Sequence, residues 1–260
     1  MKKFGLIGHP ISHSLSPKLF KAAYNGKYNY DLIESSEFED AYSKFLAEYD
    51  GINITAPFKE NAWKKADKYT DSCKKIGAAN ILLKKGGQIL ALNSDYSGIV
   101  HTLLEYSLEK GSKTLVVGCG GAGKAATIAA LDLGLNVNLY NRTTSRAKVW
   151  LKFANIEEEV TLIDETELIS NFYNYDLIIY TLPCKLDGLE GILTEGHKSK
   201  TIIFEANYKD PIFSGEVLKS FLDSGGRYIS GKTWLLNQAL IGYEIFTGEK
   251  VNFGEMKEIL

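Results

Sequence analysis

A glycine-rich turn between a strand and a helix, near the middle of the chain, constrains the fold more than any other feature. Residues 113–117 form an apolar strand segment, and glycines follow it at positions 118, 120, 121 and 123. The small residues that come next predict a closely packed helix, and residues 136–140 predict a second strand. Glycines at this spacing let the backbone approach a pyrophosphate, and the helix N-terminus supplies unpaired N–H groups. This order of elements predicts a dinucleotide-binding domain.

The residues after the second predicted strand indicate which dinucleotide binds. Sites for NAD usually place a carboxylate there, which accepts from the ribose 2′-hydroxyl. This chain has Asn141 and Arg142 at that place, with Arg146 one turn later. A guanidinium pairs with a 2′-phosphate through several donors, whereas a carboxylate would repel it. The residues alone therefore favour NADP(H), although a merely solvated surface arginine is the alternative interpretation.

Composition and charge exclude several other classes of protein. The chain has 260 residues, of which 45% are hydrophobic and 24% charged, and its net charge is −2. This balance does not indicate binding to nucleic acid or to an anionic membrane, and no apolar run is long enough to span a bilayer. The three cysteines and four histidines form no metal-ligand pattern. We expect a cytoplasmic protein without a metal, and the sequence leaves a homodimer open.

The part that precedes the glycine turn also alternates strand and helix patterns. Ser16 is expected to cap a helix whose first turn holds Pro17, and Pro57 is expected to start another helix. Two apolar runs around Gly86 and Gly87 predict a hairpin. The sequence therefore predicts two α/β domains, with strands at 4–8, 28–33, 51–55, 78–83 and 88–92 in the first.

Polar side chains gather at the predicted ends of these first strands. If the strands run parallel, such side chains converge at one edge of a sheet. Hydroxyl, amide, amine and carboxylate groups together suit a small polyhydroxylated acid. The residues concerned are Ser14, Ser16, Asn53, Thr55, Lys59, Asn80 and Asp95.

Lys59 and Asp95 are the predicted reacting pair. Reduction of a ketone leaves an alkoxide, which a lysine ammonium can stabilise and protonate while a carboxylate orients the ammonium. Each residue also has a simpler interpretation. Lys59 belongs to a lysine-rich helix on which most side chains are only solvated, and Asp95 could cap the following helix.

Seven segments, in the same order as in the family, resemble shikimate dehydrogenase. The resemblance implies reversible NADPH-dependent reduction of 3-dehydroshikimate to shikimate, in the pathway to chorismate and aromatic amino acids. It also implies an α/β fold in which residues 1–100 form a substrate-binding and catalytic domain and residues 101–230 a Rossmann-type, doubly wound NADP-binding domain. Residues 231–260 would form C-terminal helices that return to the substrate domain. The matching segments are 8–17, 53–59, 77–80, 93–98, 118–122, 141–146 and 231–238.

The resemblance further implies a role for each matching residue. Lys59 would be the catalytic acid and base, with Asp95 as its partner. The substrate would be bound by Ser14, Ser16, Asn53, Thr55, Asn80, Asp95, Tyr208 and Gln238. NADP(H) would be bound by Gly118, Cys119, Gly120, Gly121, Ala122, Asn141, Arg142, Thr143, Arg146, Ala206, Gly231 and Asp71.

The chain departs from the family pattern in a few places. Ser94 stands where the family usually has threonine, and Trp234 or Leu235 stands where it usually has methionine. Two alternatives remain at this point. One is a quinate/shikimate dehydrogenase that uses NAD(H), and the other is a sensor on the same fold that binds the ligands without turnover.

Overall fold

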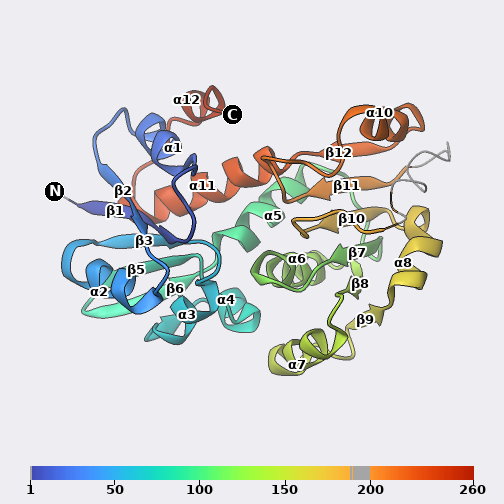
Figure 1. Cartoon of the computed structure of the whole chain (residues 1–260), viewed down its shortest axis with the longest axis horizontal. Helices are drawn as coiled ribbons and strands as arrows, with labels where there is room; N and C mark the ends of the chain where they lie inside the picture. Colours follow the sequence, from blue (N-terminus) through green and yellow to red (C-terminus); the bar gives the residue numbers. More distant parts are fainter. Residues whose placement is uncertain (1, 188, 190–199) are drawn as a thin grey trace. The chain divides into compact units, whose positions relative to one another are not determined.

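The computed structural model describes residues 2–187, 189 and 200–260 (Figure 1). The chain divides into two compact units, each built on one six-stranded sheet. The first unit comprises residues 1–98 and 236–260, and the second comprises residues 99–235. The predicted α/β fold with a Rossmann-type second domain is confirmed.

The sheet of the first unit is mixed, with strand order β2-β1-β3-β5-β6-β4. The strands β1, β2 and β3 run parallel to one another, whereas β5 runs antiparallel to both β3 and β6. The end of β3, the start of β5 and the end of β6 therefore meet at one edge, which we call the carboxyl edge of the first sheet. The bounds are β1 (Lys3–Gly8), β2 (Asn29–Glu34), β3 (Gly51–Ile54), β4 (Lys68–Tyr69), β5 (Ile81–Lys85) and β6 (Gln88–Leu92).

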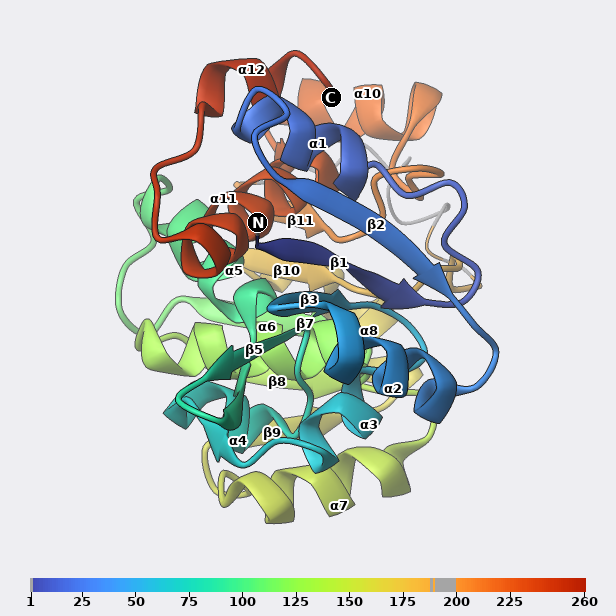
Figure 2. The ribbon, with the colours of Figure 1, turned by 90° about the vertical axis from the view of Figure 1, so that its left-hand side faces the viewer.

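Helices cover both faces of the first sheet (Figure 2). Phe45 of α2 and Ala62 of α3 pack with Ile7 and Ile52 on one face. On the other face, Phe4 of β1 stacks on Phe246 of α11 with ring centroids 5.0 Å apart. Burial of a phenylalanine side chain contributes roughly 1.5–3 kcal/mol, so such contacts hold the C-terminal segment in this unit. The bounds are α1 (Ser16–Ala23), α2 (Phe38–Glu48), α3 (Lys59–Lys64), α4 (Asp71–Ile76), α5 (Ser94–Leu104), α11 (Gly231–Thr247) and α12 (Phe253–Lys257).

The second sheet has the strand order of a dinucleotide-binding domain. Every registered pair of strands is parallel, and the order is β9-β8-β7-β10-β11-β12. Numbered within the unit this order is 3-2-1-4-5-6, which reverses direction between β7 and β10. The bounds are β7 (Lys113–Val117), β8 (Asn136–Tyr140), β9 (Val160–Ile163), β10 (Leu177–Tyr180), β11 (Ile202–Glu205) and β12 (Arg227–Ile229).

Helices on the second sheet differ in the size of the side chains that they bury. Four buried alanines let α6 approach β7, β8 and β10 closely. Larger side chains, such as Leu168 and Phe221, join α8 and α10 to the core on Leu115, Val117 and Ile178. The bounds are α6 (Gly121–Asp132), α7 (Thr144–Ala154), α8 (Glu165–Asn171) and α10 (Gly215–Asp223), with a 3₁₀ turn η1 (Phe172–Asn174).

Two predicted helix starts were wrong. Ser16 is the first helical residue of α1, and the cap position falls on Leu15. The Ser14 hydroxyl instead accepts from the Ser16 N–H at 3.3 Å, so this nearby side chain meets a donor of the first turn. Pro57 lies in the turn before α3, which begins at Lys59.

Candidate active site

The predicted reacting pair comes together at the carboxyl edge of the first sheet. Lys59 is the first residue of α3, after β3, and Asp95 lies in the first turn of α5, after β6. Lys59 Nζ lies 2.5 Å from Asp95 Oδ2, and the two side chains are only 20% and 12% exposed. Because the pair is mostly shielded, salt screens it less than a surface ion pair. Lys59 is therefore held in place rather than simply solvated.

A neighbouring residue caps α5 and leaves Asp95 for this role. The side chain of Asn93 accepts from the Tyr96 N–H through Oδ1 at 3.1 Å and donates to Ala78 O through Nδ2 at 2.9 Å. The simpler interpretation of Asp95 as the helix cap was thus wrong. The cap also ties the start of α5 to the segment that carries Asn80.

A buried hydrogen-bond network joins three polar side chains beside the ion pair. Asn80 Nδ2 donates to Ser94 Oγ at 3.1 Å, and the Ser94 N–H donates to Asn80 Oδ1 at 2.7 Å. The Ser94 hydroxyl donates to Gln238 Oε1 at 3.0 Å. Asn80 and Ser94 are 3% and 1% exposed, so the network orients Gln238 from a rigid base. Ser94 was not among the predicted site residues, although its place beside Asp95 in a matching segment was a signal.

Close helix packing brings Gln238 to this network. A Cβ added at Gly98 of α5 would lie 2.8 Å from the Gln238 N atom of α11. Real Cβ atoms do not approach backbone so closely, and only glycine permits this helix crossing. Gln238 thus reaches Ser94 because Gly98 lacks a side chain.

Asn53 is oriented by a tyrosine that the sequence analysis did not identify. The Tyr30 hydroxyl donates to Asn53 Oδ1 at 2.8 Å, and Asn53 Nδ2 donates to Asn80 O at 3.3 Å. Burial raises the pKa of Tyr30, so its hydroxyl stays a donor. No local pattern could have found this contact, because Tyr30 lies on β2, two strands away from β3. Thr55 follows β3 at the same edge and is half-buried.

The two predicted carboxylate-binding serines lie side by side where the loop after β1 meets the start of α1. The Ser14 hydroxyl donates to Ser16 Oγ at 3.2 Å, and both residues are partly exposed. The Tyr243 hydroxyl of α11 donates to Ser16 O at 3.1 Å and so holds the start of α1 in place. Two adjacent hydroxyl groups of this kind can donate to the two oxygens of one carboxylate.

The glycine turn of the second unit leaves no room for a side chain at two of its glycines, Gly118 and Gly123. Gly118 has φ +105°, and a Cβ added at Gly123 would lie 1.9 Å from Gly118 O. A Cβ at Gly118 would lie 2.6 Å from Thr181 Oγ1, whose hydroxyl donates to Val117 O. By contrast, among the described residues no atom beyond the two chain neighbours lies within 4 Å of a Cβ added at Gly120. The turn and the first residues of α6, Gly121 and Ala122, thus leave open space at a helix N-terminus, as a pyrophosphate requires.

Asn141 braces this turn from the end of β8. Its Oδ1 accepts from the Cys119 N–H at 3.1 Å, and its Nδ2 donates to Thr143 O at 2.8 Å. Arg142 and Arg146 are exposed on the following segment. Shaped backbone, a helix N-terminus and two exposed guanidinium groups fit a dinucleotide that carries a 2′-phosphate.

The remaining predicted site residues, which include Tyr208 for the substrate, lie apart from the turn along the chain. A Cβ added at Gly231 would lie 2.6 Å from Ala206 O, so α11 starts against the end of β11. Tyr208 is half-buried in the loop after β11, and burial raises its pKa. Asp71 is the exposed first residue of α4 in the first unit.

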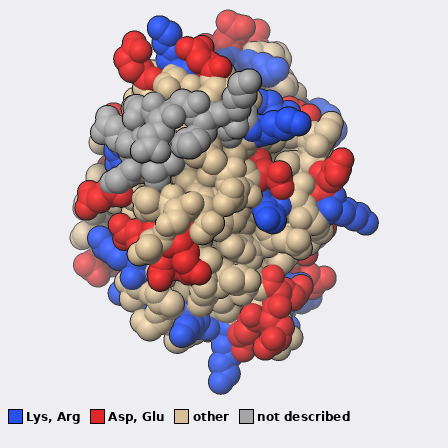
Figure 3. All heavy atoms as spheres, turned by 90° about the vertical axis from the view of Figure 1, so that its right-hand side faces the viewer, with Lys and Arg blue, Asp and Glu red and all other residues tan. Residues whose placement is uncertain are grey.

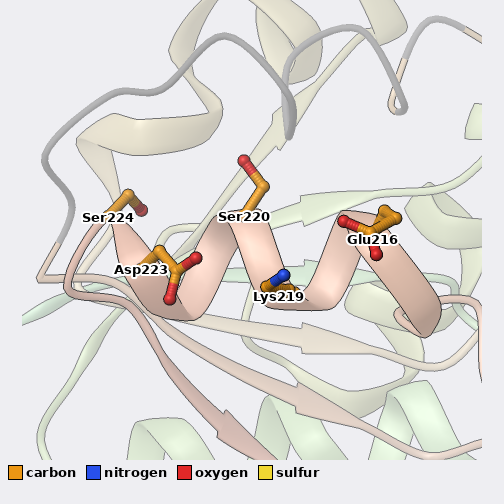
Figure 4. Close-up of a pocket in the computed structure, with 5 residues that line it drawn as sticks. All are labelled: Glu216, Lys219, Ser220, Asp223 and Ser224. Atoms are coloured by element: carbon orange, nitrogen blue, oxygen red, sulfur yellow. The ribbon is translucent and has the colours of Figure 1, made fainter.

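A surface cavity of the second unit involves none of the predicted site residues among the part of the chain that the structure describes. It measures about 350 Å³ and runs along α10, and its described lining comes from that helix and its C-cap Ser224 (Figure 4). Acidic and basic side chains are interspersed on the face drawn in Figure 3.

Within residues 2–187, 189 and 200–260, no His, Cys, Asp or Glu side chains form a group that could hold a metal. In this same part of the chain, no helix combines the length and the apolar character needed to cross a membrane.

Known proteins resemble this chain over nearly its whole length. Residues 6–82 match the family described as shikimate dehydrogenase substrate binding domain. A shikimate dehydrogenase (NADP(+)) of Ignicoccus hospitalis is 30% identical, over 99% of this chain and 97% of its own length. The crystal structure of shikimate dehydrogenase from Aquifex aeolicus has a TM-score of 0.83 at 27% identity and covers 100% of this chain and 97% of its own. Quinate dehydrogenase from Corynebacterium glutamicum, in complex with NAD, has a TM-score of 0.85 at 22% identity, with 99% and 98% covered; it shows the shared fold alone.

Proposed function

The chain belongs to the shikimate dehydrogenase family, and we propose that it catalyses the reversible NADPH-dependent reduction of 3-dehydroshikimate to shikimate. The reaction would contribute to the synthesis of chorismate and aromatic amino acids. The observation that carries the proposal is the shielded Lys59–Asp95 ion pair, which adjoins the Asn80–Ser94–Gln238 network at one sheet edge. A cation that can give a proton and a set of hydroxyl-binding amides are what reduction of a polyhydroxylated ketone needs.

Lys59 acts as the general acid in the reduction. NADPH, when bound, would supply the hydride for the reduction. The Lys59 ammonium donates a proton to the oxygen on which negative charge develops, and in the reverse direction neutral Lys59 removes that proton from the hydroxyl. Asp95 holds Nζ in position throughout through the 2.5 Å contact.

The remaining polar residues of the first unit would bind the rest of the substrate. The paired hydroxyls of Ser14 and Ser16 suit the ring carboxylate. The hydroxyls and ring substituents would be bound by Asn53, Thr55, Asn80, Asp95 and Gln238. Tyr208 would contribute its phenol near the carboxylate. Residues 1–100 would accordingly serve as the substrate domain.

Residues 101–230 would bind NADP(H). The backbone from Gly118 to Ala122 would hold the pyrophosphate, because the turn is open at Gly120 and α6 begins there. Arg142 and Arg146, with Asn141 and Thr143, would hold the ribose 2′-phosphate. Ala206, Gly231 and Asp71 would lie near the nicotinamide. A biosynthetic enzyme of this kind would work in the cytoplasm, and a homodimer is compatible with the proposal.

A comparison of substrates and cofactors tests the proposal directly. Purified protein is given shikimate with NADP⁺ or NAD⁺, then quinate in place of shikimate, and formation of the reduced nicotinamide is followed by its near-ultraviolet absorbance. We expect rapid reduction of NADP⁺ by shikimate, and little with any other pair. The Lys59→Ala variant, prepared in the same way, serves as the control for contaminating activity.

Two other results would favour the alternatives. Preferred turnover of quinate with NAD⁺ would assign the chain to the quinate/shikimate dehydrogenases. Binding of NADP⁺ and shikimate without turnover by any pair would indicate a sensor, and would contradict the role of Lys59 as an acid.

A further inference from the structure

A fully buried carboxylate that the proposed reaction does not use ends strand β11. Glu205 is 0% exposed. Its Oε1 accepts from the Ile212 N–H at 2.6 Å, and its Oε2 accepts from the Tyr228 hydroxyl at 2.7 Å and the Phe213 N–H at 3.3 Å. These donors are neutral, unlike the ammonium that holds Asp95.

Burying a carboxylate in this way costs free energy, which packing of the core alone would not require. Burial raises the pKa of Glu205 because the three hydrogen bonds do not make up for the lost hydration. A neutral or apolar side chain of the same shape would serve packing equally well. What distinguishes a carboxylate is that one group accepts from two successive backbone N–H groups and a phenol. We therefore consider what Glu205 does for the backbone at Ile212 and Phe213, which its two carboxylate oxygens hold in place.

The backbone in question is the loop that carries Tyr208. The loop leaves β11 where the Ala206 N–H donates to Tyr180 O at 2.8 Å. Within it, Asn207 Nδ2 donates to Asp210 O at 2.6 Å, and Asn207 Oδ1 accepts from the N–H groups of Lys209 and Asp210. Glu205 closes the far end by binding Ile212 and Phe213. Tyr208 thus lies on a loop that two side chains stabilise, Asn207 within the loop and Glu205 at its end.

We propose that Glu205 is a positioning residue for the substrate, which it serves by holding the loop that presents Tyr208. The inference rests on the proposed function, in which the Tyr208 phenol binds near the substrate carboxylate. A phenol donor adds affinity only if its oxygen is held at the distance and angle of a hydrogen bond. With the loop fixed at both ends, Tyr208 meets the substrate without first being ordered, which lowers the entropic cost of binding.

The change from glutamate to glutamine tests the clamp with little change in shape. An amide has one acceptor oxygen, and its NH₂ group would face either the Ile212 or the Phe213 N–H, donor against donor. The far end of the loop would then lose an anchor while the core stays filled. Tyr228→Phe is the milder variant, since it removes one donor and leaves both backbone contacts intact.

Steady-state kinetics and calorimetric binding of shikimate would be measured for wild type, Glu205→Gln, Tyr228→Phe, Tyr208→Phe and the Glu205→Gln/Tyr208→Phe double variant. We expect Glu205→Gln to raise the KM for shikimate about five- to fifty-fold and change kcat less than about threefold, because the lost contact binds ground and transition states alike. In the Tyr208→Phe background, the same change should raise KM less than about twofold, since coupled residues are not additive. Tyr228→Phe should shift KM in the same direction by a smaller factor.

A destabilised control separates positioning from general loss of structure. Asp164 caps α8 in the same unit by accepting from the Glu167 N–H at 2.8 Å, and it lies outside the proposed sites. Asp164→Ala should lower the melting temperature and leave both Michaelis constants unchanged.

Two kinds of result would overturn the inference. One is an unchanged KM for shikimate in Glu205→Gln, or an equal rise in the Tyr208→Phe background, in an enzyme whose wild type oxidises shikimate. That outcome would leave the proposed function intact. The other is a wild-type protein that neither binds nor oxidises shikimate, which would refute the proposed function and this inference with it.

Discussion

The two candidate sites are built by different means. In the first unit the chemistry is carried by side chains that hold one another, such as Lys59 with Asp95 and Asn80 with Ser94. In the second unit the site is a shape of the backbone, in which Gly118 and Gly123 leave no room for a Cβ and Gly120 leaves open space. Most residues of the turn contribute by having no side chain or only a small one.

Because the two sites are built differently, different kinds of substitution should disrupt them. A site of side chains loses its chemistry when one functional group is removed, while the fold survives. A site of backbone fails when one methyl group is added, because packed atoms must move apart to admit it. Substitutions that remove groups from the first unit and add them to the second therefore test the comparison.

The largest effect is expected for Lys59→Ala. Loss of the general acid should lower kcat about a hundred- to ten-thousand-fold, with a modest change in KM, because the proton is needed only in the transition state. Initial rates with shikimate and NADP⁺ measure this. Lys64→Ala, at the exposed end of the same helix, is the matched control and should retain full activity. A kcat that stays near wild type in Lys59→Ala would remove Lys59 from the mechanism.

Two glycine variants should separate packing from ligand space in the turn. Gly123→Ala places a methyl 1.9 Å from Gly118 O and should cost about 1–3 kcal/mol or more, which thermal denaturation would detect. In the described part of the chain, the methyl group of Gly120→Ala has no atom within 4 Å other than its chain neighbours, so the melting temperature of the ligand-free protein should not change. If the pyrophosphate occupies that space, NADP⁺ affinity should still fall about tenfold or more. Unaltered NADP⁺ binding in Gly120→Ala would show that the ligand lies elsewhere.

Arg142→Leu tests the one place where a side chain should matter in the second site. Loss of a charge-assisted contact to the 2′-phosphate should weaken NADP⁺ about ten- to a hundred-fold and leave NAD⁺ nearly unaffected. Michaelis constants for both cofactors measure the ratio. Lys148→Leu, which removes an exposed cation on α7, controls for general electrostatics. Equal losses for both cofactors would mean that Arg142 does not contact the phosphate.

The smallest effect concerns pH and Glu205. Its folded-state pKa is raised, chiefly by burial, so its contribution to stability is present at low pH and is lost as pH rises through the folded pKa. The melting temperature of wild type relative to Glu205→Gln should therefore be highest at acidic pH and should fall as the pH rises through the folded-state pKa. Thermal denaturation across that range measures the difference. The opposite trend would indicate a carboxylate stabilised by its charge.

Local patterns were sufficient for the strand, turn, helix and second strand that open the second unit, but not for β9, α8, α10 and β12, which the sequence did not predict. The apolar strand, the glycines and the alanine-rich helix are consecutive in the chain, and each sets its own geometry within a few residues. The hairpin of β5 and β6 around Gly86 and Gly87 was predictable for the same reason. The start of α1 was misjudged, because both Ser14 and Ser16 can cap and only their placement decides between them.

The first site depended on contacts that local patterns do not contain. Tyr30 lies 23 residues from Asn53 and donates a hydrogen bond to it across the intervening strand β1. Gln238 reaches Ser94 from 144 residues away. Asn93, rather than Asp95, caps α5, although both residue types suit that position. In each case several partners satisfy the same local rule, and packing selects one.

Residue types and their spacing in the sequence establish which chemical groups this protein has available: a glycine turn between a strand and a helix, arginines after a strand, and a lysine and an aspartate at strand ends. Residue type and spacing are sufficient there, because backbone freedom and side-chain charge are properties of single residues. The tertiary structure decided which of these groups meet. An antiparallel β5 brings Asn80 to the edge where Lys59 and Asp95 lie, and the buried carboxylate of Glu205 holds the loop of Tyr208. Such pairings arise when the whole core packs, since each is stable only after water has been excluded from both partners.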